Sequence, residues 1–474
     1  MRTTRGLVGT ILAGTLIVAS CVGGDDDDPA GGDAERNADA ESYTLRVMSN
    51  AALGEGAKNA EEAMWITEYV IPEFEAAQEA EGIDVTVEFV ERGVDDDDYK
   101  NKLALDMGAE EAADVIAIDG IWVGEFAAAQ EIAPLDDTVG ADEVSAWEGW
   151  DQIPDTIASL MEFDGDRYGV PAGTDGRVIY YRKDLFQQAG LPADWQPTSW
   201  QEILDAAEAL GELPGVTPMQ LNAGTAMTEA TTMQGFLPLL NGTGVELYAD
   251  GKWQGATPEV VEVLEMYATV YSGGLGDPNL QKTVKGRDDS FLKFADGEIG
   301  MLIESDYFWR DVVNPRTGVA PMENRDDVVG WALIPAQEPG SGIEGKDFLS
   351  LSGGGGWVVN PDTEYPQQAW DFLTFMLSKE ALLERLRGEP QISPRTDVND
   401  ELLRNDPHLA FIADEVLPIT DFRPALEEYT DVSLFIQEAT LDVVNGADPA
   451  EAAQTYEEKL IERVGEDAVV TGSG

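Results

Sequence analysis

The pattern of apolar and polar positions from residue 43 to residue 129 predicts strands that alternate with helices. Residues 43–48 and 85–90 alternate between apolar and polar side chains, as half-buried strands do. Residues 114–118 are almost uniformly apolar, as in a strand covered on both faces. Apolar residues at helical spacing occupy 63–78, 99–107 and 122–129. This alternation favours a mostly parallel α/β sheet, whose ligands bind beyond the carboxyl ends of the strands.

The remainder of the chain also contains both kinds of element. Further strands are predicted at 168–171, 178–181, 299–303 and 357–360, and further helices at 200–210, 258–271, 290–295 and 366–377. The region 406–463 is predicted to be mainly helical. Before the helix at 200–210, Thr198 or Ser199 is a natural N-cap, and Glu202 is placed to complete a capping box.

Length and composition indicate more than one folded unit. The chain has 474 residues, which suggests two or three domains, and 43% of them are hydrophobic. With 11 Trp, 13 Tyr and 15 Phe it can bury substantial cores, so global disorder is excluded.

The charge balance is strongly acidic and limits the partners that the chain can have. There are 92 acidic and 29 basic residues, which give a formal net charge of -63 at pH 7. Nucleic acid is therefore not expected as a partner, because phosphate binding needs patches of Lys and Arg. Anionic membrane surfaces are disfavoured for the same reason. So large an excess is typical of proteins that work in concentrated salt, although a merely acidic bacterial protein is the alternative.

The scarcity of cysteine and histidine excludes several chemistries. Cys21 and His408 are the single residues of their kinds. A lone cysteine cannot form an internal disulfide, and this composition argues against a dedicated zinc or transition-metal site. A Ser-His-Asp site could form only around His408, and that residue follows Asp406 and Pro407 in what is predicted to be an ordinary helix start.

The first forty residues have the layout of an export signal followed by a spacer. Basic residues precede an apolar stretch at 7–18, and small residues lead to Cys21, as in a secretion signal too short to span a membrane. The position of Cys21 resembles a bacterial lipobox, so residues 1–21 are expected to be a lipoprotein signal. Residues 22–41 are expected to be a flexible acidic linker. The aspartate runs at 25–28 and 95–98 lack the spacing of a calcium loop and are expected to be solvated.

Several segments together resemble the family 1 extracellular solute-binding proteins of ABC importers, most closely the trehalose/maltose and multiple-sugar class. Each motif is weak alone, and the resemblance comes from their number and order over nearly all of residues 43–465. The segments that carry it are 114–126, 134–136, 168–185, 197–200, 294–301, 355–357, 369–373 and 393–397. The resemblance departs at 305–309, where Ser-Asp-Tyr-Phe-Trp replaces the Asn-Trp-Pro-like pattern of the trehalose/maltose group.

The resemblance implies a two-lobed α/β periplasmic-binding-protein fold with multiple hinge crossings. One lobe is expected at 42–175 plus 350–392, and the other at 178–335 plus 397–465. A small-molecule sugar would bind in the cleft without cofactor, metal or chemistry, and lobe closure would present a surface to the permease subunits. The protein would be a monomer held by its lipid anchor outside the cytoplasm.

The same resemblance, together with carbohydrate chemistry, selects candidate binding residues. Carboxylates and Arg bind hydroxyl groups, and aromatic faces cover the apolar faces of sugar rings. Asp119 could instead cap a helix, Trp122 could pack in a core, and Asp175 could stabilise a turn. The glycine run at 353–356 would let the backbone approach the ligand. The candidates are Arg92, Asp119, Trp122, Asp175, Glu304, Tyr307, Trp309, Gly356, Trp357 and Arg423.

Two other functions remain open from the sequence. A secreted glycoside hydrolase would need two carboxyl groups at a defined separation, and with 92 acidic residues such pairs carry no information. A binding protein for another solute, such as a polyamine, iron or phosphate, would share the fold. A phosphate site would need a basic cluster or helix N-terminus, and none stands out, whereas an acidic cleft could suit a polyamine.

The charge excess leads to a prediction about salt. We expect the unfolding temperature to rise markedly between about 0.05 M and about 2 M salt, because the Debye length falls to roughly 3 Å near 1 M and the self-repulsion is then screened. Thermal unfolding followed by circular dichroism measures this change. A transition temperature that does not depend on salt would contradict adaptation to high salt.

Overall fold

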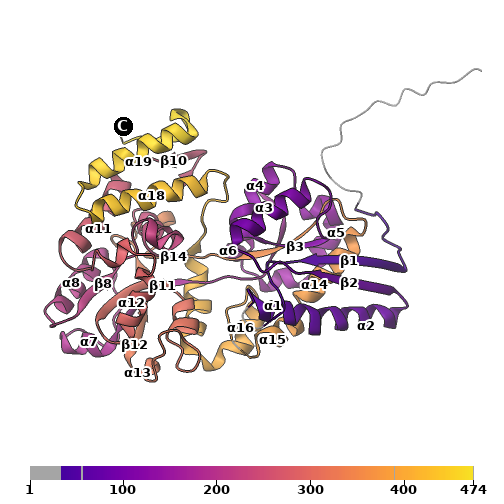
Figure 1. Ribbon diagram of the computed structural model, residues 1–474, viewed down its shortest axis with the longest axis horizontal. Helices are drawn as coiled ribbons and strands as arrows, with labels where there is room; N and C mark the ends of the chain where they lie inside the picture. Colours follow the sequence, from indigo (N-terminus) through magenta and orange to yellow (C-terminus); the bar gives the residue numbers. More distant parts are fainter. Residues whose placement is uncertain (1–33, 55–56, 389, 473–474) are drawn as a thin grey trace, which may run out of the picture.

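The computed structural model describes residues 34–54, 57–388 and 390–472, and these form two α/β lobes (Figure 1). Each lobe has its own β-sheet, and the chain passes between the lobes more than once. The predicted lipoprotein signal with Cys21 lies outside the described residues, as does the first part of the predicted linker.

Lobe 1 is built on a five-stranded sheet in the order β2-β1-β3-β15-β6. The strands are β1 (Ser42–Met48), β2 (Asp84–Val90), β3 (Val115–Asp119), β6 (Gly169–Pro171) and β15 (Gly355–Val359). The first three are parallel, and β15 runs antiparallel between β3 and β6. Because β1, β2 and β3 point the same way, their carboxyl ends meet at one edge of the sheet. Its helices are α1 (Ala60–Trp65), α2 (Ile71–Glu81), α3 (Asp96–Met107), α4 (Val123–Ala128), α5 (Ala141–Ala146), α6 (Asp155–Ala158), α14 (Pro366–Met376) and α15 (Lys379–Leu386).

Lobe 2 is built on a four-stranded sheet in the order β12-β7-β11-β8. The strands are β7 (Arg177–Arg182), β8 (Thr217–Gln220), β11 (Ile299–Ser305) and β12 (Val329–Ala332). Strand β11 is parallel to β8 and antiparallel to β7. The helices are α7 (Lys183–Gln188), α8 (Trp200–Gly211), α9 (Glu229–Thr231), α10 (Leu237–Gly242), α11 (Pro258–Ser272), α12 (Gly286–Ala295), α18 (Tyr429–Val444) and α19 (Pro449–Val464). Helices α18 and α19 pack on α11, along the top of this lobe in the view of Figure 1.

The chain crosses between the lobes three times within the described residues. The first crossing is 172–176, from β6 to β7, and the second is 352–354, from β14 (Phe348–Leu351) to β15. The third contains α16 (Thr396–Leu402) and α17 (Pro407–Phe411) and ends in β16 (Thr420–Asp421), which pairs with β14. Figure 1 shows α16 between the lobes, beside α15. Lobe 2 therefore does not begin abruptly at residue 397, because α16 packs on a helix of lobe 1.

The predicted elements are confirmed at the positions where periodicity is strong. The capping box before α8 forms, because the Ser199 hydroxyl accepts a hydrogen bond from the Glu202 N–H at 3.4 Å and Glu202 accepts one from the Thr198 N–H at 2.7 Å. The aspartates at 95, 96 and 98 are exposed, as expected for a solvated run, but the run is not a linker. Helix α3 begins at Asp96, where acidic side chains in the first turn favour the positive end of the helix dipole.

His408 lies fully buried where the third crossing packs on lobe 2. Asp406 caps α17 by accepting hydrogen bonds from the N–H groups of His408 and Leu409 at 3.1 and 3.0 Å, which confirms the predicted helix start. The imidazole stacks on Trp309 with ring centroids 4.8 Å apart and on Tyr180 at 5.3 Å. Neither ring nitrogen has a hydrogen-bond partner among the described residues. Burial holds the pKa of His408 well below its usual value, and Arg325 and Arg310 lower it further.

We expect His408→Phe to reduce the acid sensitivity of the fold. Because the pKa of His408 is lowered in the folded state, its neutral form contributes stability above about pH 6.5, and this contribution is lost as the pH falls below that value. The wild type should therefore lose up to about 1.4 kcal/mol more per pH unit than the variant. Urea unfolding at pH 7.5 and pH 5.5 measures the difference. Equal losses in the two proteins would show that His408 does not contribute.

Candidate functional site

A single arginine, Arg423, contacts carboxylates that come from both lobes. It lies just after β16, in the segment that leads from the hinge to α18. Its Nη2 atom is 3.7 Å from Oδ1 of Asp119, and its Nη1 atom is 3.4 Å from Oε2 of Glu229. Asp119 ends β3 of lobe 1, whereas Glu229 begins α9 of lobe 2. These three residues, here called the Arg423 cluster, link the lobes beside the hinge.

The cation of the Arg423 cluster is buried, while its carboxylates remain partly open. The Arg423 side chain is 11% exposed, and those of Asp119 and Glu229 are 37% and 40% exposed. Its Nε atom is buried without a hydrogen-bond partner among the described residues. Carboxylate oxygens are therefore available to a bound molecule, and hydrogen bonds from its hydroxyl groups to them would be charge-assisted.

Asp119 serves the backbone and the cluster at the same time. One carboxylate oxygen accepts a hydrogen bond from the Ile121 N–H at 3.1 Å, so the residue caps the short helix that follows β3. Burial raises the pKa of Asp119; Arg423 opposes this shift, and the charges of Asp96 and Asp175 add to it. The cap and the Arg423 contact both use Oδ1, so Oδ2 has no hydrogen-bond or ion-pair partner among the described residues, and the capping role is compatible with the predicted binding role.

Glu229 is held by several groups of lobe 2. Its carboxylate accepts hydrogen bonds from the hydroxyls of Tyr429 at 3.0 Å and Thr232 at 3.2 Å, and also from Ser433. The preceding residue, Thr228, has φ 49 and ψ -136, a conformation that a β-branched residue rarely adopts. Nothing in the sequence pattern singles out Glu229 among 92 acidic residues, so it was missed.

Asp175 ties the first two crossings together. Its Oδ1 atom accepts a hydrogen bond from the Gly353 N–H at 2.7 Å and also contacts Arg177. The Ser352 hydroxyl donates to the Asp175 carbonyl oxygen. The Asp175 charge also raises the pKa of Asp119 and of Asp306, so it acts on both carboxylates. The structure thus brings Asp175 near the Arg423 cluster and gives it a role in the hinge.

The glycine run brings backbone segments together within the hinge. Gly354 has φ +129, and a Cβ atom there would lie 2.1 Å from the Gly173 carbonyl oxygen. At Gly356 a Cβ atom would lie 2.4 Å from the Val170 carbonyl oxygen, inside the sheet of lobe 1. Gly356 is buried, so its small size is explained by strand packing and not by the approach of a ligand.

The carboxyl end of β11 presents one exposed aromatic residue and two buried carboxylates. Glu304 is bound by Arg287 through hydrogen bonds of 2.8 and 2.6 Å. Asp306 accepts hydrogen bonds from the Gly176 N–H at 3.1 Å and from Arg310 at 2.7 Å, which fixes the first crossing to lobe 2. Tyr307 follows and is 38% exposed, so its ring is free to cover a sugar face. It is the one predicted aromatic residue with such a surface.

The three predicted tryptophans lie in hydrophobic cores. Trp122, Trp309 and Trp357 are 8%, 3% and 2% exposed. Trp122 packs against Tyr99 and Phe126, and Trp309 stacks on His408. Buried indoles of this kind leave no ring face accessible to a ligand, so these three residues do not stack on a sugar. Their burial removes a large apolar surface from water and stabilises the cores.

Arg92 interacts within lobe 1. Its backbone N–H donates to the Ala51 carbonyl oxygen at 3.0 Å at the carboxyl end of the sheet. Its Nη2 atom lies 3.5 Å from Oδ2 of Asp106, and its side chain is 26% exposed. Arg92 thus lies at the carboxyl edge of the lobe 1 sheet, as predicted. Its charge is paired with Asp106 and not with the Arg423 cluster.

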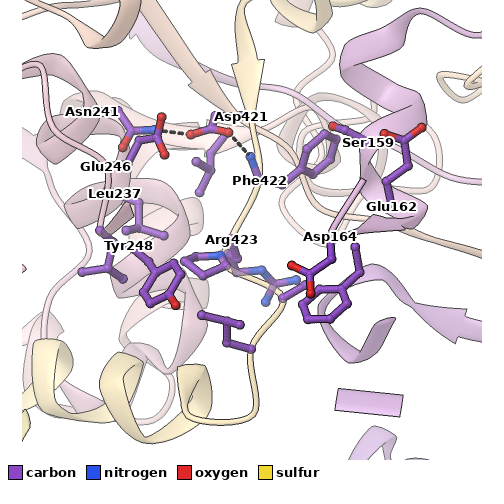
Figure 2. Close-up of a pocket in the computed structure, with 16 residues that line it drawn as sticks. Ser159, Glu162, Asp164, Leu237, Asn241, Glu246, Tyr248, Asp421, Phe422 and Arg423 are labelled. Atoms are coloured by element: carbon purple, nitrogen blue, oxygen red, sulfur yellow. Dashed lines mark hydrogen bonds between the residues drawn. The ribbon is translucent and has the colours of Figure 1, made fainter. Parts of the chain in front are cut away.

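A cavity of about 530 Å³ lies on the same hinge segment and has walls from both lobes (Figure 2). Of the predicted residues only Arg423 lines it. Figure 2 shows Glu162 and Asp164 of lobe 1 on one side, and Glu246 and Tyr248 of lobe 2 on the other. The volume falls within the usual range for small-molecule pockets. The remaining lining residues are Ser159, Phe163, Leu237, Asn241, Leu247, Leu351, Asp421, Phe422, Pro424, Ala425 and Leu426.

Neither a metal centre nor a membrane span is found in the part of the chain that the structure describes. No three His, Cys, Asp or Glu side chains are grouped there in a way that could hold a metal ion. No helix in these residues has both the length and the apolar character needed to cross a bilayer.

Comparison with known families and sequences identifies relatives that are binding proteins. The family described as bacterial extracellular solute-binding protein matches residues 57–382, which is more than half of the chain. A putative binding protein of Brucella abortus is 26% identical over 401 residues, covering 82% of this chain and 90% of the relative.

Two solved structures have the same two-lobed fold. The sugar-binding protein MalE of Xanthomonas citri superposes with a TM-score of 0.70 at 17% identity, over 90% of this chain and 98% of that one. The cyclic α-maltosyl-1,6-maltose binding protein of Arthrobacter globiformis gives 0.68 at 19% identity, over 90% and 99%. At these identities the similarity shows the fold alone. With the family match, the two sheets and the hinge between them, it follows that the chain belongs to the bacterial extracellular solute-binding proteins.

Proposed function

We propose that this protein captures a carbohydrate between its lobes and delivers it to the permease of an ABC importer. The observation that carries the proposal is the Arg423 cluster, in which partly open carboxylates from opposite lobes meet at one buried guanidinium. Hydroxyl groups that donate to Asp119 and Glu229 would contact both lobes at once, so binding would favour their closure. The sugar specificities in the names of MalE and of the Arthrobacter protein support a carbohydrate.

The charges around the cluster favour a hydroxylated solute over a polyamine. Asp96 and Asp175, the two carboxylates whose charges act on Asp119, already have cations of their own, Lys58 and Arg177, so they offer little to a second or third ammonium group. At the end of β11, Glu304 and Asp306 are paired in the same way with Arg287 and Arg310. Within the sugars, a trehalose/maltose-like oligosaccharide is our proposal, with Asp119, Glu229, Arg423 and Tyr307 as its contacts.

The family supports a location outside the cytoplasm, because its members are described as extracellular. We further propose that a lipid on Cys21 anchors the protein to the membrane. As a monomer it would present the outer surfaces of both lobes to the permease when they close. The related binding proteins also favour binding without chemistry over hydrolysis. Release of reducing sugar from an oligosaccharide by the purified protein would favour the hydrolase instead.

The ligand class can be tested by thermal unfolding of the protein without residues 1–21. In about 2 M salt, a sugar at a hundred times its dissociation constant should add roughly 2.7 kcal/mol to the free energy of unfolding and raise the transition temperature. The panel should contain trehalose, maltose and longer oligosaccharides, with polyamines and amino acids as alternatives. A shift only with a polyamine would keep the fold and overturn the carbohydrate proposal.

Arg423→Gln should weaken binding of whichever sugar the panel identifies by about ten-fold or more, because a charge-assisted contact is lost and the two carboxylates are no longer held. Calorimetry on the folded variant measures the affinity. Arg463→Gln is the matched control, since Arg463 pairs with Asp431 on the surface of α19 at 2.6 Å. Equal affinities for wild type and Arg423→Gln would remove the cluster from the site.

A further inference from the structure

The Arg423 cluster carries one negative charge more than its cation can balance. Asp119 and Glu229 both contact the same guanidinium, at 3.7 and 3.4 Å. At the end of β11 each buried carboxylate has its own cation: Glu304 and Asp306 are 2% and 1% exposed and bind Arg287 and Arg310 at 2.6 and 2.7 Å. In the Arg423 cluster the surplus charge lies on two carboxylates that are 37% and 40% exposed.

The surroundings of the cluster do not supply the missing positive charge. Asp96 and Asp175 act on Asp119 with the same sign of charge, and Arg423 is the cation that opposes them. On the side of lobe 2, Glu229 accepts from the neutral hydroxyls of Tyr429, Thr232 and Ser433. These donors orient the carboxylate and leave its charge in place.

The Arg423 cluster also has an unsatisfied hydrogen-bond donor that a bound solute could satisfy. The Nε donor of Arg423 is buried and has no acceptor among the described residues. Leaving such a donor unpaired costs about 1–3 kcal/mol, so an acceptor in the solute, such as a hydroxyl oxygen, would be bound favourably. Next to Glu229, Thr228 holds the strained backbone conformation described above, as residues at ligand-holding positions often do.

We propose that Asp119 and Glu229 together select a sugar that carries one protonated amino group among its hydroxyls, with Glu229 as the specificity-determining residue. This inference rests on the proposed function and names the ligand class of the same site. The ammonium group would lie between the two carboxylates and balance the surplus charge. Neighbouring hydroxyls would accept from Arg423 and donate to the remaining carboxylate oxygens.

The test compares pairs of sugars that differ only by amino and hydroxyl groups. The pairs are trehalosamine with trehalose, and glucosamine with glucose; N-acetylglucosamine replaces the amino group of glucosamine by a neutral amide. Affinities are measured by calorimetry at about pH 6 and about pH 9, since an amine of this kind titrates near the α-amino value of about 7.7–8.0. We expect the amino member of at least one pair to bind about ten-fold tighter at the lower pH, with the preference lost at the higher pH.

Substitutions test whether the preference for the amino sugar arises from the Arg423 cluster. Glu229→Gln should remove most of the preference for the amino sugar while the neutral partner changes less, because the glutamine keeps the shape and loses the charge. Glu208→Gln, an exposed residue of α8, is the matched control and should retain it. If amino members bind no tighter than their neutral partners, or if Glu229→Gln keeps the full preference, the inference is overturned while carbohydrate binding stands. If no sugar of either kind binds, both proposals fail.

Discussion

The arrangement of the two lobes depends on how charged groups are satisfied in a hinge that excludes much of the water. Asp306 is 1% exposed in its side chain, and it binds both the Gly176 N–H of the first crossing and Arg310 of lobe 2. Asp175 likewise binds the Gly353 N–H of the second crossing. A buried carboxylate is costly unless it is paired and hydrogen-bonded, so each of these groups fixes the backbone that it contacts. Hydrogen bonds thereby connect the first crossing to lobe 2 and to the second crossing.

This fixed hinge explains why the Arg423 cluster can act between lobes. Arg423 leaves the hinge directly after β16, which pairs with β14, so its backbone is held beside the strand that leads into the second crossing. Asp119 reaches it from the carboxyl end of β3, the edge at which open α/β sheets bind their ligands. Glu229 reaches it from lobe 2. A solute can contact both carboxylates only when the lobes are close enough together. Binding of the solute therefore favours closure of the lobes.

Charge is used in opposite ways on the surface and in the hinge. The chain carries a formal net charge of -63, and most of its acidic residues face solvent, where salt can screen them. In the hinge, arginines are gathered against a small set of carboxylates, and the neutral His408 is surrounded by aromatic rings at the third crossing. Buried carboxylates of the hinge that salt cannot screen are thus stabilised by ion pairs with arginines.

The sequence by itself determined the strands, the helices and the α/β class, because apolar periodicity records which face of each element is buried. It also indicated Asp119, Arg423 and Tyr307, which stand at element ends or in a recognisable segment. Tertiary structure alone decided that Trp122, Trp309 and Trp357 are packed in cores, since an indole has the same pattern in a core and in a cleft. It alone revealed Glu229, which lies 194 positions from Arg423 in the chain. One carboxylate among 92 acquires a role only when folding brings it to a shared cation.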